Sequence, residues 1–537
     1  MNRFGRVRAP RQNGGIEASP PLAEFGSVLA ANLRESDQPK PALLERNWRD
    51  LRGQARSAAL AAAMRYHARL DPLHLSPTAD RILMAGHQPE LFHPGVWVKN
   101  FALQGLARAQ GATALNLVVD NDTVKTTAVR LPVLAESADH PWPHLVHLPF
   151  ETWTGEVPYE EKIIQDELLF DSFAERAGQH TRAWGFEPFL GNFWQEVKRQ
   201  RRLSRNLGEC FVAARRHFER AWGCVNLEIP ASALNDTEPF AWFACHLLEN
   251  LPSFGQIYNR SVDEYRRRQG IRSRSHPVPN LAVEGDWWEA PLWFWTSSEP
   301  RRSRLFVRQT VDRLELRAGQ VLLPSLPRDR AGANTKTVRA YQELAAHGLK
   351  VRSRALVTTL YCRLFLADFF LHGIGGGKYD ELTDDLIRQW YGVEPPGFGI
   401  LTATLLLPFR RYPSTPEDQR AAARRLRDLR FNPQRYLPQN GATDPDLAHS
   451  LAEREQWVKR IPAAAADKKQ RFLALRRLNS QLASHLSAVE KEWRSEWQRR
   501  GDEVQANAVL DRRDYPFCFY PEATLRSFYA QFLNGQR

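Results

Sequence analysis

The stretch RILMAGHQPELFHPGVWVKNFALQGLARAQGATALNLVVDND, residues 81–122, decides the fold class of this chain. A short apolar run over 81–87 is followed by a helical pattern over 96–111 and by a β-branched apolar run over 113–122. This order of strand, helix and strand predicts two parallel strands joined by a right-handed crossover helix. We therefore expect an α/β protein with a Rossmann-like parallel core.

Length and composition restrict the protein class. At 537 residues the chain exceeds one ordinary core, which predicts several domains or large insertions. Hydrophobic residues make up 43% and charged residues 25%, as is typical of globular proteins. The longest apolar stretch, 354–377, contains Arg363 and Asp368 and predicts core, so we expect no membrane partner. Five widely spaced Cys and an N-terminus without a secretory signal predict a cytoplasmic protein with reduced thiols and no bound metal.

The net charge of +13 comes mainly from arginine, with clusters at 196–206, 264–275 and 299–308. Such a surplus favours anionic partners, and the alternative is that the arginines only solvate the surface. None of the clusters carries an interleaved aromatic platform or a recognisable nucleic-acid-binding module. We therefore expect a small-molecule substrate and no nucleic acid.

Changes in the hydrophobic pattern divide the chain into six predicted segments. Within them we expect a helix over 41–70, a strand over 224–236 and a parallel-type strand over 350–359. The segments are a flexible N-terminal tail (1–40), the first half of the core with a helical insertion (41–223), an inserted segment with a small antiparallel meander at 286–318 (224–320), the second half of the core (321–412), a helical region (413–505) and a C-terminal segment that packs on the core (506–537).

The helical region 413–505 has a well-specified start, because Thr415 suits an N-cap and Pro416 suits the first helical position. Leucines recur at intervals of three and four through 467–501. This pattern predicts a long helical hairpin of coiled-coil character, which would offer a surface for a homodimer.

Three polar segments follow predicted strands, where ligands bind in open α/β sheets. The first contains Gly86, His87 and Gln88, with His93 just before a helix. Backbone N–H groups and the helix dipole favour an anion there, and His side chains can donate to it. The alternative is a tight turn whose His residues bind local carbonyls.

The second segment is Asp120, Asn121 and Asp122 after the run LNLVV. Carboxylates there could hold a substrate amine, a ribose hydroxyl or Mg²⁺. An Asx-turn that ends the strand is the alternative.

The third segment contains Gly375, Gly376, Gly377 and Lys378. Glycines allow close approach of the backbone to an anion, and Lys378 adds a charge. It is not a P-loop, because Tyr379 replaces Ser or Thr, and a plain tight turn is the alternative. The chain lacks a nucleophile elbow, a zincin helix and a kinase motif set, which disfavours hydrolases and kinases.

Taken in order, these segments resemble one family, the cysteine-adding enzyme (BshC, a cysteine ligase) of bacillithiol biosynthesis. AGHQPELFHPGVWVKN (85–100) is similar to the family's first loop and helix, and LNLVVDNDT (115–123) to its strand with an acidic end. LYCRLFLADFFLHGIGGGKYDELTD (360–384) and PGFGILTATLLLP (396–408) are similar to later segments. The chain departs from the family at His87, where Gln is usual, and over 224–318.

The resemblance implies a core akin to class I aminoacyl-tRNA synthetases, with helical insertions and a C-terminal coiled coil. It also implies a ligase that joins an amino acid carboxyl to the amine of an amino-sugar acceptor. In that reading His87, His93, Asp120 and Asp122 are catalytic. The substrate- or anion-binding residues are Gly86, Gln88, Asn121, Gly375, Gly376, Gly377 and Lys378.

The cofactor stays open in the sequence, and ATP with Mg²⁺ would serve if the carboxyl group must be activated. One alternative is a synthetase-like nucleotidyltransferase in which His87 and His93 contact ATP phosphates. The other is a non-catalytic basic protein that binds RNA or a protein partner, which would show a steep salt dependence.

Overall fold

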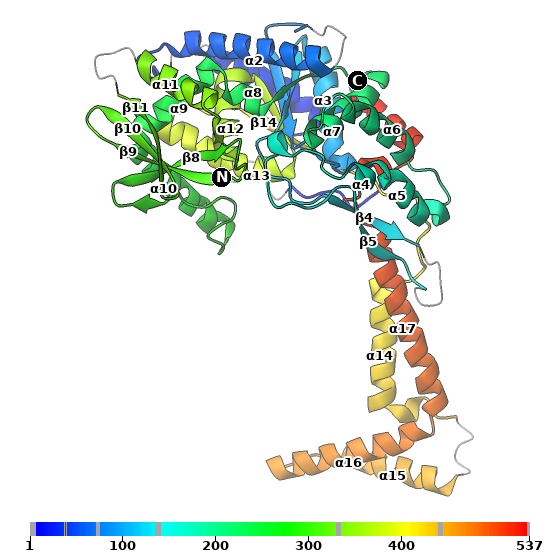
Figure 1. Ribbon diagram of the computed structural model, residues 1–537. Coiled ribbons are helices and arrows are strands. Elements are labelled where there is room, and N and C mark those ends of the chain that lie inside the picture. The colour runs from blue at the N-terminus through cyan, green and yellow to red at the C-terminus, as the bar shows by residue number, and fades with distance from the viewer. Residues whose placement is uncertain are drawn as a thin grey trace. The chain divides into compact units, whose positions relative to one another are not determined.

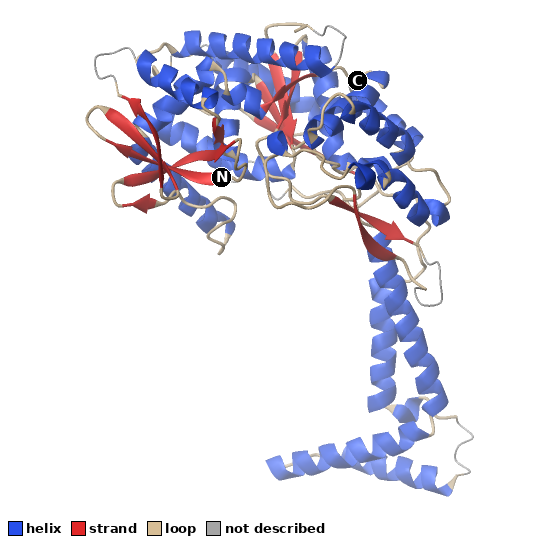
Figure 2. Ribbon diagram, viewed as in Figure 1, coloured by secondary structure: helices blue, strands red, loops and turns tan. Residues whose placement is uncertain are grey.

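The computed structural model describes residues 7–36, 38, 40–70, 76–134, 141–328, 334–438 and 444–533. The chain forms two compact units. The first contains 1–131, 147–406 and 513–537, and the second contains 132–146 and 407–512. The first unit holds a largely parallel sheet and a separate antiparallel sheet, both surrounded by helices (Figure 2). The fold is therefore mixed α/β, as predicted.

The largely parallel sheet has six strands in the order β1-β14-β13-β2-β3-β6. Its strands are β1 (Gly15–Ser19), β2 (Ile82–His87), β3 (Thr113–Val118), β6 (Leu227–Pro230), β13 (Phe369–His372) and β14 (Phe398–Thr404). All neighbours pair in parallel except β1, which runs antiparallel to β14. The first parallel strand in the chain, β2, lies in the middle, and the strand order reverses between β2 and β13. The predicted parallel pair β2-β3 is confirmed.

The crossover helix between β2 and β3 is α3 (Pro94–Gln110). It begins after His93, whose Nδ1 accepts a hydrogen bond from the Gly95 N–H at 3.1 Å. A Cβ on Gly95 would overlap the Ala403 carbonyl oxygen of β14, and one on Gly105 would overlap the Phe532 carbonyl oxygen of α18 (Glu522–Leu533). These two glycines let α3 approach both neighbours closely.

The face of the sheet formed by Ile82 and Met84 packs against α2 (Trp48–Leu70) and shares one core with α9 (Glu238–Glu249), α12 (Ala355–Tyr361) and α13 (Ile374–Leu386) (Figure 1). The helix predicted over 41–70 starts only at Trp48. Its true N-terminal signal is Asn47, whose side-chain oxygen accepts hydrogen bonds from the backbone N–H groups of Arg49 and Asp50.

The antiparallel sheet has the order β11-β10-β9-β8-β12, and β7 (Val283–Glu284) pairs with β8. Its strands are β8 (Trp287–Thr296), β9 (Ser303–Gln309), β10 (Arg313–Ala318), β11 (Val321–Pro327) and β12 (Leu349–Ser353). The predicted meander over 286–318 is confirmed. The parallel-type strand predicted over 350–359 is wrong, because β12 pairs antiparallel with β8 and α12 begins at Ala355. A short apolar run does not specify which sheet it joins.

The prediction of a flexible tail over 1–40 is also wrong for the part that the structure describes, while 1–6, 37 and 39 lie outside the described residues. Gly15–Ser19 forms β1, and α1 (Phe25–Ser36) follows it. The Phe25 ring lies 5.2 Å from the ring of Phe369, and Asn32 donates to the backbone oxygens of Asp368 and Gly397. These contacts join residues that are more than 300 positions apart in the chain. A local sequence pattern therefore cannot predict them.

Two other predicted elements change in detail. The strand predicted over 224–236 is limited to β6 and continues as the short helix α8 (Ala231–Asn235). The apolar segment after α12 forms a π-helical turn over Cys362–Leu366 before β13. The helices of the remaining first unit are α4 (Glu167–Asp171), α5 (Phe173–Thr181), α6 (Leu190–Arg201), α7 (Leu207–Ala221), α10 (Leu251–Gln269) and α11 (Thr335–Ala346).

The second unit is built mainly from α14 (Pro416–Phe431), α15 (Pro445–Lys459), α16 (Ala465–Ser484) and α17 (Ser487–Leu510). The predicted start is confirmed, since Thr415 and Asp418 form a capping box before α14. Helix α14 packs along α17, and α15 packs along α16, so the region forms two helix pairs rather than one long hairpin. A two-stranded sheet consists of β4 (Ala128–Val133) and β5 (His144–Pro149).

The five cysteines are all free and buried, which agrees with the predicted reduced thiols. Burial raises the pKa of the Cys362 thiol, as expected of a core residue rather than a nucleophile. Over the described residues, no helix is both long enough and apolar enough to cross a lipid bilayer.

We predict that Gly95→Ala destabilises the protein by about 1–3 kcal/mol or more, because the new methyl group has no room beside the Ala403 carbonyl. Gly53→Ala is the matched control, since Gly53 lies in α2 with open space around its Cα. Removing a mid-helix glycine there should stabilise by about 0.5–1 kcal/mol. Thermal unfolding of both variants measures the difference, and equal melting temperatures would contradict the close approach of α3.

Candidate functional site

The carboxyl ends of the parallel strands collect polar residues at one edge of the sheet. His87 ends β2, Asp120 follows β3, Ser232 follows β6 and Gly373 follows β13. In open α/β sheets this edge is where ligands bind.

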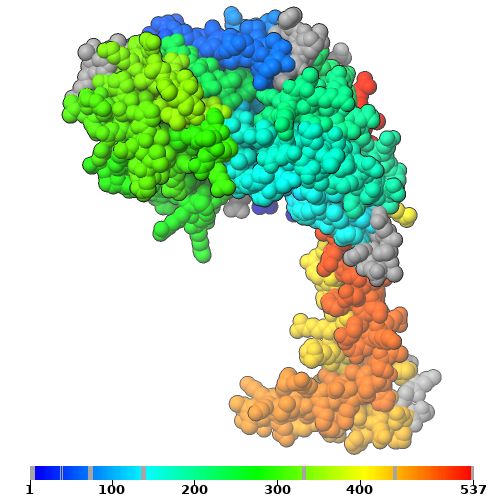
Figure 3. Space-filling view, in the orientation of Figure 1, coloured from blue at the N-terminus to red at the C-terminus, as the bar shows by residue number. Residues whose placement is uncertain are grey.

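The first two predicted segments meet at Asp122. Its Oδ2 accepts a hydrogen bond from Gln88 Nε2 at 2.8 Å, and its Oδ1 lies 2.9 Å from Arg302 Nη1. The Arg302 guanidinium also lies 4.7 Å from the Trp293 ring centre in β8. In the space-filling view, the green meander segment borders the cyan segment that follows β3 (Figure 3). Both oxygens of Asp122 are therefore engaged in joining β2, β3 and the meander.

Asn121 has a similar linking contact. Its Nδ2 donates to the Ser353 carbonyl oxygen at 2.9 Å, and the side chain is buried. This predicted binding residue thus connects β3 to β12.

Both predicted histidines are neutral at pH 7. Burial, followed by the nearby Lys99 ammonium, lowers the pKa of His87 to about 3. Burial, followed by Arg513, lowers the pKa of His93 to about 4. Since His93 Nδ1 accepts from Gly95, its Nε2 carries the proton. The Nε2–H of His93 can therefore donate one hydrogen bond to a ligand, whereas the Nδ1–H of His87 already donates to the Gln88 carbonyl oxygen at 3.2 Å. Neither ring brings a positive charge.

The positive charge at this edge comes from Lys99, which sequence reasoning missed. Its Nζ donates to the Gly86 carbonyl oxygen at 2.7 Å, and the residue is only 3% exposed. It forms no ion pair with a carboxylate of the described chain. Burial lowers the pKa of Lys99 to about 8. The available signal was a lysine inside the apolar helical run VWVKNFA.

Lys99 lies where the strand order reverses. Its Cε is 4.0 Å from the position of a Cβ built on Gly373, the N-cap of α13. The buried ammonium, the end of β2 and the first turn of α13 therefore come together between β2 and β13.

The predicted glycine loop is wrong, because Gly375, Gly376, Gly377 and Lys378 form the first turns of α13. A Cβ on Gly376 would lie 2.8 Å from His372 Nδ1, and one on Gly377 would overlap the side chain of Ile400. The glycines thus allow the helix to pack closely on β13 and β14. Lys378 is exposed on the helix surface.

A pocket of about 360 Å³ lies beyond the carboxyl ends of β3 and β6. Asp120 is the predicted site residue that lines it. The other charged lining residues, which sequence reasoning missed, are Arg69, Glu160, Glu209, Asp236, Lys350 and Arg352.

Asp120 is held by Ser232, whose backbone N–H donates to Oδ1 at 2.8 Å and whose hydroxyl donates to Oδ2. The Glu160 N–H donates to the Asp120 carbonyl oxygen at 2.8 Å, which places the two acidic residues side by side. Burial, followed by the Glu160 carboxylate, raises the pKa of Asp120 to about 7. Asp120 can therefore exchange a proton near neutral pH.

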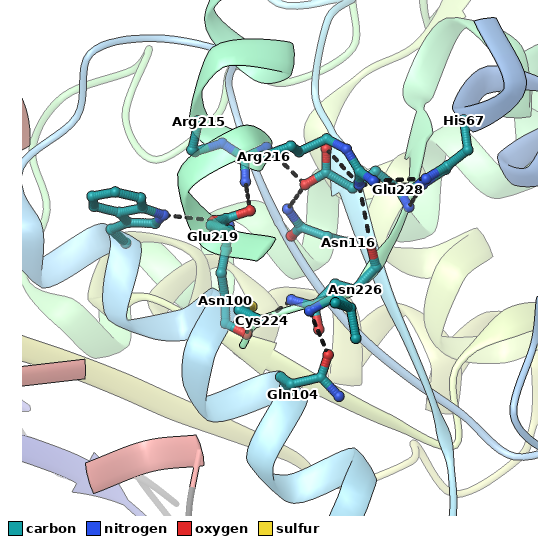
Figure 4. Close-up of polar contacts among 12 residues, drawn as sticks. His67, Asn100, Gln104, Asn116, Arg215, Arg216, Glu219, Cys224, Asn226 and Glu228 are labelled. Carbon is teal, nitrogen blue, oxygen red and sulfur yellow. Dashed lines mark hydrogen bonds and ion pairs between the residues drawn. The ribbon is translucent and has the colours of Figure 1, made fainter. Parts of the chain in front are cut away.

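A buried ionic network positions α3 and β6, the elements that carry Lys99 and precede Ser232 (Figure 4). Arg215 of α7 bridges Glu219 at 2.5 Å and Glu228 of β6 at 2.7 Å. Glu219 accepts hydrogen bonds from Trp97 and Asn100 of α3. Burial alone would raise the pKa of Glu228, but Arg215 and Arg216 hold it below its ordinary value.

The same network covers the free edge of β6. His67 of α2 accepts a hydrogen bond from the Glu228 N–H at 2.7 Å, and Arg216 donates to the Asn226 carbonyl oxygen at 3.1 Å. Side chains thus take the place of a further strand and satisfy the edge.

No protein-family model and no curated protein sequence matches this chain. Within the described ranges, no group of three or more His, Cys, Asp or Glu side chains is arranged to hold a metal ion.

We predict that His87→Gln flattens the dependence of stability on pH between about 6.5 and 4. As the pH falls through about 6.5, His87 of the unfolded chain takes up a proton while the folded chain stays neutral until about 3. The wild type therefore loses stability in this window, by up to about 1.4 kcal/mol per pH unit from this group. Melting temperatures across the window test this, and parallel curves for both proteins would contradict it.

We further predict that Glu228→Gln costs about 3–5 kcal/mol, because it removes one of the two carboxylates that bind the buried Arg215 guanidinium. Glu284→Gln is the control, since Glu284 pairs with Arg317 at the surface and is 53% exposed. Its loss should cost at most about 1 kcal/mol. Chemical denaturation of the two variants compares them, and similar losses would show that the buried network adds little.

Proposed function

We propose that this chain is a ligase or transferase of the cysteine-adding type, which joins an amino acid carboxyl to the amine of an amino-sugar-derived acceptor. The observation that carries the proposal is Lys99, a buried ammonium at the reversal of the strand order that has no carboxylate partner among the described residues. A substrate carboxylate or phosphate would supply the missing negative charge.

The energetics of Lys99 favour an anionic ligand. Burying an ammonium costs several kcal/mol unless an opposite charge offsets it. The Gly86 carbonyl is a dipole, which offsets only part of this cost. With a pKa of about 8, Lys99 is largely protonated at neutral pH and can bind an anion.

The strand order supports a Rossmann-like core. The five parallel strands follow the doubly wound order, in which two halves extend from a central first strand. Such sheets bind ligands outside the carboxyl ends at the reversal, which here lies between β2 and β13. This agrees with the synthetase-like core that the resemblance implies, with 155–222 as a helical insertion.

The residues present fit ATP better than a protein-bound Mg²⁺. When bound, ATP would activate the carboxyl group, and Lys99 with the first N–H groups of α13 would hold its phosphates. For Mg²⁺ the fit is poor, because Gln88 and Arg302 already engage Asp122, and we assign no step to the metal.

We expect the purified protein to form a cysteine adduct of glucosaminyl malate when incubated with cysteine, Mg²⁺ and ATP, as detected by mass spectrometry. Lys99→Met keeps the packing but removes the charge, and should slow product formation by about 100-fold. Lys336→Met is the control, since Lys336 lies exposed on α11. Circular dichroism checks that both variants are folded.

Other outcomes discriminate between functions. Pyrophosphate release with ATP and an amino acid alone, without adduct, would favour the nucleotidyltransferase. Adduct formation that is unchanged in Lys99→Met would contradict the role of this residue while leaving the activity in place.

A further inference from the structure

We infer that the pocket beyond β3 and β6 binds a primary ammonium group and that Asp120 accepts a proton from it. This inference rests on the proposed function, because it assigns the subsite of the acceptor amine. It stands on the charge balance of the pocket, on an acceptor atom without a hydrogen bond and on the pocket size.

The charges that line the pocket do not balance. Four carboxylates and three cations line it. The cations are already paired, Arg69 with Glu209, Arg352 with Asp236 at 2.8 Å, and Lys350 with Glu160 at 3.4 Å. One carboxylate is left over.

That carboxylate is Asp120, which forms no ion pair with any residue in the described part of the chain. The hydrogen bonds to its side chain come from the N–H and hydroxyl groups of Ser232, and both are uncharged donors. A carboxylate has about four acceptor positions, so each oxygen of Asp120 can accept a further hydrogen bond. The pocket therefore offers negative charge and free acceptor capacity at one place.

Glu160 provides a second acceptor beside Asp120. Its side chain is 7% exposed, and its Oε1 accepts no hydrogen bond from the described residues, although Lys350 Nζ lies 3.4 Å away. A buried carboxylate oxygen without a donor is unfavourable. A primary ammonium carries three N–H donors and can serve both carboxylates. A quaternary ammonium has none and would leave Glu160 unsatisfied.

The pocket size and lining restrict the rest of the ligand. About 360 Å³ is at the small end of ligand pockets. Most of the lining residues are polar or charged, which suits a hydroxylated molecule of monosaccharide size. An amino sugar therefore fits better than a long aliphatic amine.

The chemical step at Asp120 is a proton transfer. An N–H bond of the ammonium breaks, its electron pair stays on nitrogen, and an O–H bond forms on the Asp120 carboxylate. The neutral amine is then a nucleophile for the activated carboxyl carbon. The charged or titratable groups that face Asp120 are Glu160 of the turn Tyr159–Glu161, Arg352 of β12 and Tyr66 of α2. Their combined effect leaves the pKa of Asp120 at about 7, which suits proton exchange with an amine.

Isothermal titration calorimetry with glucosamine tests this inference without ATP or cysteine. We expect the wild type to bind glucosamine and not N-acetylglucosamine, which has the same ring but no basic nitrogen. Asp120→Asn should weaken glucosamine binding at least 10-fold. Asp50→Asn, which removes an exposed carboxylate of α2 outside the pocket, should leave it unchanged.

Titrations in two buffers of different ionisation enthalpy count the protons exchanged on binding. The wild type should exchange protons near pH 7, and Asp120→Asn should lose this exchange. Ser232→Ala keeps the carboxylate but removes one of its donors, so the midpoint of the pH dependence should move upward. A merely structural role of Asp120 would not change the proton count.

The outcomes separate this inference from the proposed function. Equal affinity for both sugars, no binding of glucosamine by the wild type, or unchanged binding by folded Asp120→Asn would overturn the amine site. Glucosamine binding that depends on Asp120, without formation of a cysteine adduct, would support the amine site and count against the ligase.

Discussion

The buried ion chain from Glu219 through Arg215 to Glu228 is the interaction on which the site depends. Glu228 is fully buried in β6, and Glu219 accepts from two donors of α3. Each charge in the chain would be costly alone, so the elements that carry them are held in one arrangement. The ammonium of Lys99 and the carboxylate of Asp120 occupy their places because α3 and β6 are fixed in this way.

Each of the two proposed subsites contains one charged group that lacks a partner of opposite charge, and the charge is positive in one subsite and negative in the other. Among the described residues, the buried ammonium of Lys99 has no carboxylate partner and the carboxylate of Asp120 forms no ion pair with a cation. Arg215 and Arg352, by contrast, have carboxylate partners, and Arg352 pairs with Glu160 and Asp236. A substrate that carries an anion and an amine would neutralise both Lys99 and Asp120.

Sequence reasoning reached part of this site. Asp120 and His87 were found because polar residues directly after apolar runs mark strand ends. Lys99 was hidden inside a helical pattern, where a lysine usually points to solvent. Arg352 and Glu160 lie far from Asp120 in the chain. Glu160 meets it through a backbone hydrogen bond, and Arg352 lies on β12, which pairs with β8. Asp122 and Asn121 looked like binding residues but are engaged in contacts with Gln88, Arg302 and Ser353.

The sequence alone determined the α/β class, the strand-helix-strand unit over 81–122, the meander over 286–318 and the capped start of α14. These follow from periodicity and capping, which act between residues close in the chain. Only the tertiary structure decided that 15–19 forms a strand, that β12 belongs to the meander, that 375–378 is helical and which charged groups lack a partner. Such features depend on contacts between distant residues, and their energy is decided by burial, which a local pattern does not record.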